Sequence, residues 1–401
     1  MEQNVSFASL TVVLGIAFVV PVALGCVPWL RIPAVVVEIV LGIVVGPQVL
    51  DWARVDAPVG ILSVIGLAFL LFLCGLEVDL DRLRGRVLHL AVVAFGLSLV
   101  LALAVGAALD IAGLVRSPVL AAIILTATSL GLVLPTIREG GRATTEFGQL
   151  VFAGATLGNL VSALLLSLLF SRDSNDVGTR IVLLGGFAVT VAVLVMALNH
   201  RRASMPVSRL LVRLQDTSAQ VRVRGAMFLL LLLVLAAQEF GLAAILGAFV
   251  AGAVLSVLDR DGVRTHPLFR VKLDAIGYGF VIPVFMVAAG LLFDLDALVD
   301  QPSVLLRVPL FLLALLIVRG VPALVFRPVL GTRRSVAAGL LLATSLPFIV
   351  AATEIGQSLD VITRGTAAAF VTAGLLSALL FPLVADALLR ADARRTAQVA
   401  V

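Results

Sequence analysis

Charged residues are scarce in this chain, and their scarcity decides its class. Only 13% of the 401 residues are Asp, Glu, Lys or Arg, whereas 61% are hydrophobic. A soluble domain carries about 25% charged and about 45–50% apolar residues. A chain with so few polar residues cannot cover a water-exposed surface. The composition therefore excludes a water-soluble enzyme and predicts an integral membrane protein.

Cysteine and lysine are nearly absent. The two cysteines, Cys26 and Cys74, lie inside apolar runs without metal-site spacing, so we expect small buried side chains and no resident metal. All but one of the 29 basic residues are arginines, placed in short gaps between apolar runs. This pattern is typical of topology signals and argues against a nucleic-acid partner. Because no nucleophile constellation, phosphate loop or dinucleotide fingerprint occurs, we expect neither an enzyme nor a cofactor.

Long apolar runs fill most of the chain. A transmembrane helix needs about 20 predominantly apolar residues, and the alternation of a β-barrel is absent. The sequence therefore predicts an all-α integral membrane protein with about 13 transmembrane helices. They are expected at 8–28, 33–50, 58–76, 87–109, 119–137, 148–171, 181–199, 223–239, 241–257, 277–293, 303–325, 335–353 and 365–389.

The basic residues of the gaps are unequally divided between the two sides of the membrane. With thirteen spans, 22 basic residues fall on the side that carries the C-terminus and six on the other, while Arg319 lies inside a span. The positive-inside rule places the C-terminus in the cytoplasm and the N-terminus outside, in a multi-pass protein of the cell (inner) membrane.

Three sequence words recur in order at an offset of about 215 residues. The repeated words are Gly75-Leu76-x-x-Asp79-Leu80-Asp81 with Gly290-Leu291-x-x-Asp294-Leu295-Asp296, Ala127-Thr128-Ser129-Leu130 with Ala343-Thr344-Ser345-Leu346, and Ser162-Ala163-Leu164-Leu165 with Ser377-Ala378-Leu379-Leu380. A shift of seven spans is odd, so each repeated helix enters the membrane from the opposite side. We therefore predict one transporter domain over 1–401, a 6+1+6 inverted repeat: repeat one at 8–171, a linker helix at 181–199, repeat two at 223–389 and a cytoplasmic tail at 390–401. Transporters use this layout, with their site near the midplane.

The two Ala-Thr-Ser-Leu words fall in mid-span, and each is followed by a proline, Pro135 or Pro347. Hydroxyls beside proline at this depth indicate two broken or unwound helices whose freed carbonyls can hold an ion. The alternative is that the hydroxyls only bond back to their own helices.

Three further polar residues lie within apolar runs. Arg319 is a permanent cation near the middle of the eleventh run and is either a functional group or a structural tie. Asn159 lies on a polar stripe of the sixth run with Thr156 and Ser162, and it either coordinates a cation through its carbonyl oxygen or bonds to a neighbouring helix. Glu38 is the carboxylate placed most clearly inside an apolar run.

The chain resembles the Kef- and NapA-like monovalent cation:proton antiporters over nearly its whole length. The motifs that carry the resemblance are Pro33-x4-Glu38-x3-Gly42-x3-Gly46-Pro47, Leu71-Phe72-Leu73-Cys74-Gly75-Leu76-Glu77-Val78-Asp79, Ala127-Thr128-Ser129 with Leu134-Pro135, and Gly247-Ala248-Phe249-x-Ala251-Gly252. The resemblance implies an NhaA/NapA-like fold in which spans five and twelve cross as unwound helices. It also implies sodium– or potassium–proton exchange by an elevator-like movement of a core of spans four to six and eleven to thirteen, and a homodimer. Because the chain ends soon after the last run, we expect no nucleotide-binding regulatory domain.

The resemblance also places the ion site, where this sequence differs from the family. The sixth span of these antiporters carries one or two aspartates, and the matching residues here are Gly158 and Asn159; the basic residue of span eleven is Arg319. Three hypotheses follow: an antiporter, even a transport-impaired one, with asparagine where an aspartate belongs; proton coupling moved to Glu38 or another carboxylate; or an anion or organic-solute carrier on the same scaffold. A non-transporting scaffold or sensor is a further alternative. The predicted ion-binding residues are Asn159, Thr128, Ser129, Ser162, Thr344 and Arg319, with Glu38 as the candidate proton carrier.

Overall fold

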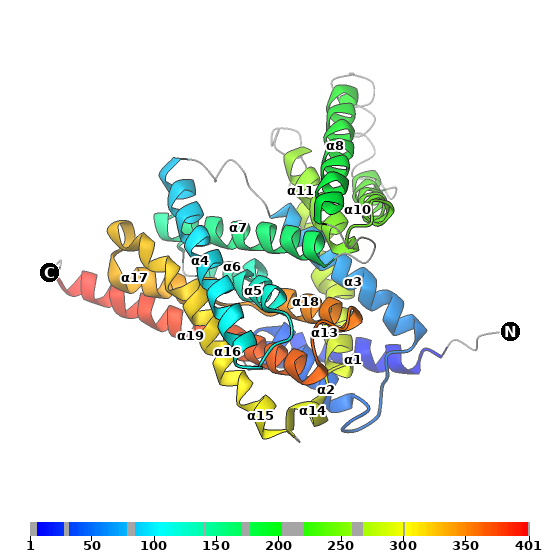
Figure 1. Cartoon of the computed structure of the whole chain (residues 1–401), viewed down its shortest axis with the longest axis horizontal. Helices are drawn as coiled ribbons and strands as arrows, with labels where there is room; N and C mark the ends of the chain where they lie inside the picture. The colour runs from blue at the N-terminus through cyan, green and yellow to red at the C-terminus, as the bar shows by residue number, and fades with distance from the viewer. Residues whose placement is uncertain are drawn as a thin grey trace. The chain divides into compact units, whose positions relative to one another are not determined.

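The structure, a computed structural model, describes residues 6–27, 32–77, 85–139, 141–170, 177–202, 220–258, 268–299 and 301–399. Within these ranges every regular element is a helix (Figure 1). A helix satisfies its backbone hydrogen bonds internally, which the interior of a bilayer requires. The predicted all-helical membrane fold is confirmed.

The described residues form two compact units. The first unit comprises those within 1–61, 80–162 and 286–401, and the second those within 62–79 and 163–285. The helices assigned wholly to the first unit are α1 (Ala8–Cys26), α2 (Ala34–Val45), α4 (Gly85–Ile111), α5 (Pro118–Thr126), α6 (Leu130–Glu139), α14 (Leu295–Val299), α15 (Pro302–Leu305), α16 (Arg307–Leu315), α17 (Arg327–Leu342), α18 (Pro347–Ser358) and α19 (Arg364–Val399). The second holds α8 (Val177–Arg202), α10 (Val221–Glu239), α11 (Ala244–Leu258) and α12 (Leu268–Ile276). The chain passes between the units inside α3 (Ala57–Leu76), α7 (Glu146–Leu169) and α13 (Ile282–Leu291).

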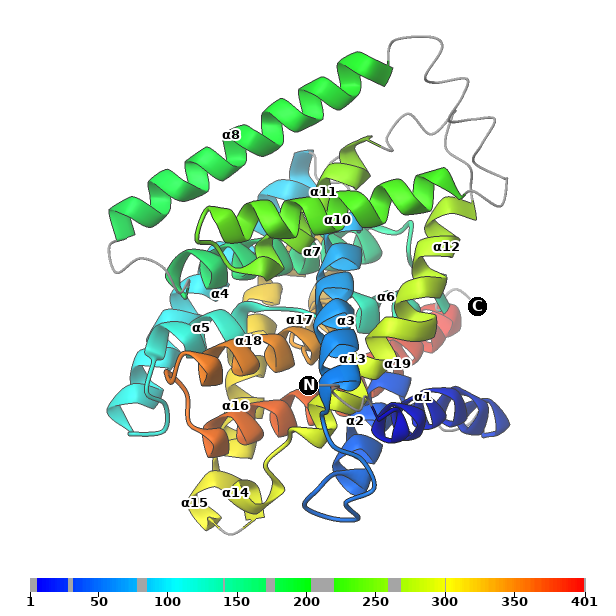
Figure 2. The ribbon, with the colours of Figure 1, turned by 90° about the vertical axis from the view of Figure 1, so that its right-hand side faces the viewer.

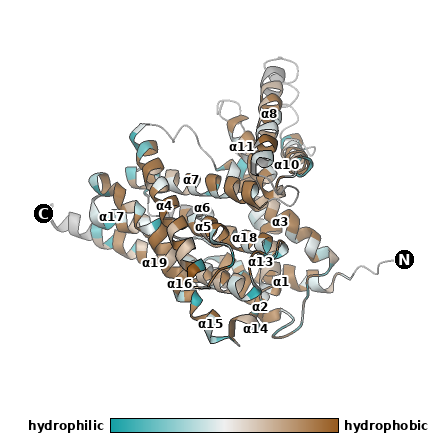
Figure 3. Ribbon diagram, viewed as in Figure 1, coloured by the Kyte–Doolittle hydropathy of each residue, from teal (hydrophilic) through white to brown (hydrophobic). Residues whose placement is uncertain are grey.

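Each of the thirteen predicted runs overlaps a helix. Eight helical stretches of the described chain are long and apolar enough to cross a membrane, and one of them, Pro302–Ser358, contains two of the predicted runs. Four shorter apolar helices carry the remaining runs, and apolar residues dominate these helices along their length (Figure 3). The count of thirteen crossings and the inverted repeat stay predictions.

Helical structure extends beyond several of the predicted boundaries. The arginines of the gap predicted after residue 325 lie in α17. A π-helical turn, Leu316–Gly320, and a 3₁₀ turn, Pro322–Phe326, connect α16 to α17. Two helical stretches meet in α17 at Gly331, whose φ of 76° glycine adopts readily. α19 continues to Val399, because its last residues are mainly Ala and Arg, which are strong helix formers.

Helices of the first unit pack through small residues and aromatic rings. Gly42 of α2 and Gly290 of α13 meet backbone to backbone, since a Cβ at either position would overlap the facing helix. α17 and α16 both pack against α19 (Figure 1). Phe311 and Phe370 stack between α16 and α19 with ring centroids 3.8 Å apart. These contacts form the frame that holds the broken helices described below.

The second unit is organised by a reciprocal glycine contact. A Cβ on Gly75 of α3 would overlap the carbonyl of Phe249 in α11, and a Cβ on Gly252 of α11 would overlap the carbonyl of Phe72. Close packing of this kind is typical of helices in membranes. α11 also packs against α10 (Figure 2).

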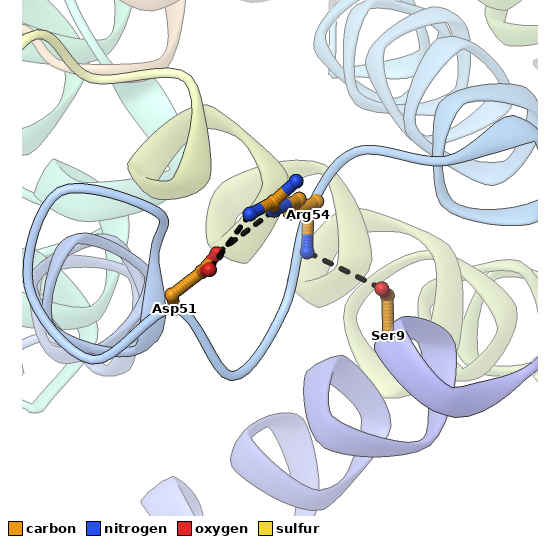
Figure 4. A network of polar contacts seen from close by, with 3 residues as sticks. All are labelled: Ser9, Asp51 and Arg54. Carbon is orange, nitrogen blue, oxygen red and sulfur yellow. Dashed lines mark hydrogen bonds and ion pairs between the residues drawn. The ribbon is translucent and has the colours of Figure 1, made fainter.

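A polar contact joins the start of α1 to the loop between α2 and α3 in the first unit (Figure 4). The Arg54 guanidinium donates to both carboxylate oxygens of Asp51, at 2.8 and 2.7 Å, and the Arg54 amide donates to Ser9 Oγ at 3.2 Å. The hydrogen bonds from Arg54 lower the pKa of the exposed Asp51 carboxyl, which keeps it ionised in the loop.

Candidate functional site

Two helix breaks face each other in the first unit. α5 ends at Thr126 and α6 begins at Leu130, while α17 ends at Leu342 and α18 begins at Pro347. The Ser129 amide donates to Thr344 O at 2.8 Å across the two breaks, and α5 and α18 lie side by side (Figure 2). The predicted breaks are confirmed. Pro347 opens α18, whereas Pro135 lies inside α6 beyond its break.

Side chains from the neighbouring long helices satisfy backbone groups that the breaks leave free. Asn159 Oδ1 of α7 accepts from the Thr128 amide at 3.3 Å. Ser377 of α19 accepts from the Ser345 amide at 3.2 Å and donates to Ser345 O at 3.0 Å. A buried unpaired backbone group costs about 1–3 kcal/mol, so these three hydrogen bonds stabilise the non-helical segments. Asn159 thus bonds to a neighbouring segment, which is the structural alternative that its sequence position offers.

Arg319 lies at the centre of this arrangement, in the π-helical turn after α16, and is only 3% exposed. Nε and Nη2 donate to Thr128 Oγ1 at 3.0 and 2.8 Å, and Nη2 also donates to Gly154 O at 2.8 Å. The guanidinium also lies 5.6 Å from the ring centroid of Phe95 on α4. Within the described ranges, neutral oxygens surround this cation and no carboxylate forms an ion pair with it.

Thr128 connects Arg319 to the second break. Its Oγ1 accepts the two arginine N–H groups and itself donates to Leu342 O, the last carbonyl of α17, at 2.5 Å. The C-terminal ends of α5 and α17 carry partial negative charge from their unpaired carbonyls. The positive charge of Arg319 compensates these ends, which supports the structural reading of the residue.

Gly158 provides the space that Arg319 occupies. A Cβ at this position would lie 2.8 Å from Arg319 Nη2 and 3.1 Å from Thr126 O. Sequence reasoning did not identify this role of Gly158, nor the contacts of Gly154 and Phe95. The four-residue spacing of Gly154 and Gly158 on one face of α7 was the available signal.

Replacing Gly158 by alanine should therefore destabilise the first unit. The added methyl must displace the guanidinium, and overpacking of this kind costs about 1–3 kcal/mol. Gly96→Ala in α4 is a matched control, because nothing lies within 4 Å of a Cβ there. Thermal unfolding in detergent should show a lower midpoint for Gly158→Ala and an unchanged or higher one for Gly96→Ala. Equal midpoints would contradict the proposed fit of Gly158 to Arg319.

Most of the predicted site residues gather around the breaks. Thr128, Asn159 and Arg319 are joined directly, and Ser162 bonds to Thr126 at the end of α5 (2.9 Å between hydroxyl oxygens). The remaining predicted residues there are Ser129 and Thr344, joined through their backbone. The Thr344 hydroxyl donates to Leu340 O, as the alternative in which the hydroxyls bond back to their own helices predicts. None of the described contacts joins Glu38 to this cluster.

Two buried hydroxyl oxygens beside the cluster lack a hydrogen-bond partner within the described residues. They are Thr156 Oγ1 on α7, three residues from Asn159, and Ser345 Oγ in the second break. Buried polar atoms are usually paired with protein or water. Oxygens at unwound helices are the ligands that transporters offer to monovalent cations. The cluster can thus hold a cation or ordered water, although its described groups include no titratable acid.

An all-helical chain with paired helix breaks about a buried polar cluster defines a multi-pass membrane protein of the transporter type. The profile of the sodium/hydrogen exchanger transmembrane family matches residues 14–391. The chain belongs to this family, which confirms the resemblance found in the sequence.

Individual relatives agree with this assignment. YjbQ of Bacillus subtilis (strain 168) is 30% identical over an alignment of 395 residues, and the match covers 95% of this chain and 62% of YjbQ. The chain thus spans less than two thirds of the length of that relative. The Na(+)/H(+)-K(+) antiporter GerN of Bacillus cereus is 26% identical over 67% of each chain. The sodium proton antiporter MjNhaP1 of Methanocaldococcus jannaschii shares the fold, with a TM-score of 0.62 and 18% identity over 95% of this chain and 98% of its own.

Proposed function

We propose that the protein exchanges a monovalent cation, sodium or potassium, for protons across the cell (inner) membrane. The pair of facing helix breaks, with buried hydroxyls beside them, is the observation that carries the proposal. It is supported by the exchanger family and by relatives named as antiporters rather than enzymes. GerN is named for both sodium and potassium, so the choice between these cations is left to experiment.

The ion would bind at the breaks, among the oxygens of Thr128, Ser129, Asn159, Ser162 and Thr344. Arg319 would act by holding the two breaks in register, since its donors already engage Thr128 and Gly154. Transporters of this kind expose such a site alternately to each side. We propose an elevator-like movement of the core formed by spans four to six and eleven to thirteen, in an inverted-repeat homodimer with its N-terminus outside and its C-terminus in the cytoplasm.

A second candidate function is transport of an anion or organic solute. It is favoured by one observation: the described residues around Arg319 place no carboxylate against this buried cation. A ligand with a negative charge would supply the missing counter-charge. We rank it second, because the relatives are named as cation antiporters and the arginine donors are occupied by protein oxygens.

Proton movement in proteoliposomes tests the proposal. Sodium, potassium or lithium is added to vesicles that enclose a pH-sensitive dye, at pH 6.5 to 9, with protein-free vesicles as the control. Cation exchange predicts that at least one cation drives protons across the membrane at a protein-dependent rate. If folded, reconstituted protein leaves the dye signal unchanged with every cation, the cation proposal fails and anion uptake becomes the assay of choice.

A further inference from the structure

Glu38 lies on the packed face of α2, in the first unit. It is 4% exposed, and Gly42, one turn later on the same face, meets the backbone of α13. Val40 and Val44 lie on the opposite face and are 43% and 37% exposed. Because residues four apart lie one above the other on a helix, the Glu38 side chain is directed into the protein and away from the outer surface of α2.

Glu38 and Arg319 are the two buried charged side chains of the described chain. They have opposite charge and belong to the same compact unit. Within the described ranges, neither forms an ion pair: Arg319 is surrounded by neutral oxygens, and no hydrogen bond to the Glu38 carboxyl is recorded. An ionised carboxylate buried without a partner is unfavourable, so it must bind either a proton or a cation.

Among the described helices, α1, α13 and α19 contact α2. α1 and α13 contain no charged residue, and Glu38 is the sole charged residue of α2. The charges of α19, which also contacts α2, are Arg364 at its start and Asp386, Arg390, Asp392, Arg394 and Arg395 near its end, on either side of an uncharged stretch at 365–385. Neither α1, α13 nor the middle of α19 supplies a fixed counter-charge for Glu38, which leaves a mobile proton or cation as its partner.

Exchange of a cation for a proton requires a group that releases a proton when the cation arrives, and Asn159 cannot titrate. We propose that Glu38 is this group, an inference that rests on the proposed cation:proton exchange. When a cation arrives, the carboxyl O–H bond breaks, the proton passes to water and the carboxylate oxygens bind the cation, at a position on the transport path that is separate from the oxygens of the breaks. One positive charge replaces another, so the buried site keeps its net charge through the cycle.

The decisive comparison is between Glu38→Gln and Glu38→Asp in proteoliposomes, with Glu239→Gln, an exposed glutamate at the end of α10, as the matched control. Cation-driven proton flux should fall below about a tenth of the wild-type rate in Glu38→Gln. It should persist in Glu38→Asp with a shifted pH midpoint and stay unchanged in Glu239→Gln. Cation addition to purified, weakly buffered protein should release one proton fewer per chain from Glu38→Gln than from the wild type.

The outcomes separate the two proposals. If the wild type moves no protons with any cation, the proposed function fails. If the wild type exchanges and a folded Glu38→Gln exchanges and releases protons equally well, the function stands and Glu38 is only a buried structural carboxyl. Should Glu38→Gln not fold, Glu38→Asp decides: a shifted pH midpoint supports the inference, and an unchanged profile overturns it.

Discussion

Asn159→Asp is expected to increase cation-driven proton flux by about tenfold at sub-saturating cation concentration, the effect of about 1.4 kcal/mol of added binding energy. The new carboxylate can accept the Thr128 amide hydrogen bond that the asparagine oxygen now accepts. It also places a negative charge next to Thr128, the residue that Arg319 contacts, so the cost of burying it is partly offset. The variant adds a titratable acid at the predicted ion site, where the described groups include none, and should change the pH profile of exchange.

Asn159→Ala is the matched control for this prediction. It removes the acceptor of the Thr128 amide without adding charge, and should cost about 1–3 kcal/mol of stability with no gain in transport. The flux is measured with the vesicle dye assay over a range of cation concentrations, and folding by thermal unfolding. A folded Asn159→Asp that matches the wild type in rate, cation affinity and pH profile would show that this position is not part of the ion site.

Replacement of Arg319 should have the largest effect on stability. Truncation to alanine removes the hydrogen bonds to Thr128 Oγ1 and Gly154 O and leaves a cavity, a combined loss of about 2–4 kcal/mol after relief of the buried charge. Arg319→Lys keeps the charge, but an ammonium cannot reproduce the forked hydrogen bonds of the guanidinium. The stability of this variant should therefore lie between those of the wild type and Arg319→Ala. Exchange should fall in the same order, because the register of the two breaks depends on these bonds.

Arg319→Met separates hydrogen bonding from the cost of the buried charge. It retains most of the side-chain volume and removes the cation. If the hydrogen bonds outweigh the desolvation cost, the methionine variant unfolds at a lower temperature than the wild type. A higher unfolding temperature would mean that the charge is a net burden on the fold, retained for transport rather than for stability, and the structural role assigned to Arg319 would be wrong.

The sequence by itself determined the features that depend on local composition. Each apolar run predicted a helix, and a helix of the described chain overlaps each of these runs. The Ala-Thr-Ser-Leu words predicted both helix breaks. Arg319 stood out because a cation in an apolar run is rare whatever surrounds it. These features follow from local properties of the residues, namely hydropathy, helix propensity and side-chain charge.

Only the tertiary structure decided which groups meet. Arg319 and Thr128 are 191 residues apart in sequence, and their hydrogen bonds depend on how the helices that carry them pack. The same packing reserves the space at Gly158 for a guanidinium and directs the Asn159 oxygen to a backbone amide. Hydropathy is a local property of the sequence, whereas hydrogen-bond partners and steric space are set jointly by distant segments, so the helix breaks and the buried arginine could be predicted from the sequence but their contacts could not.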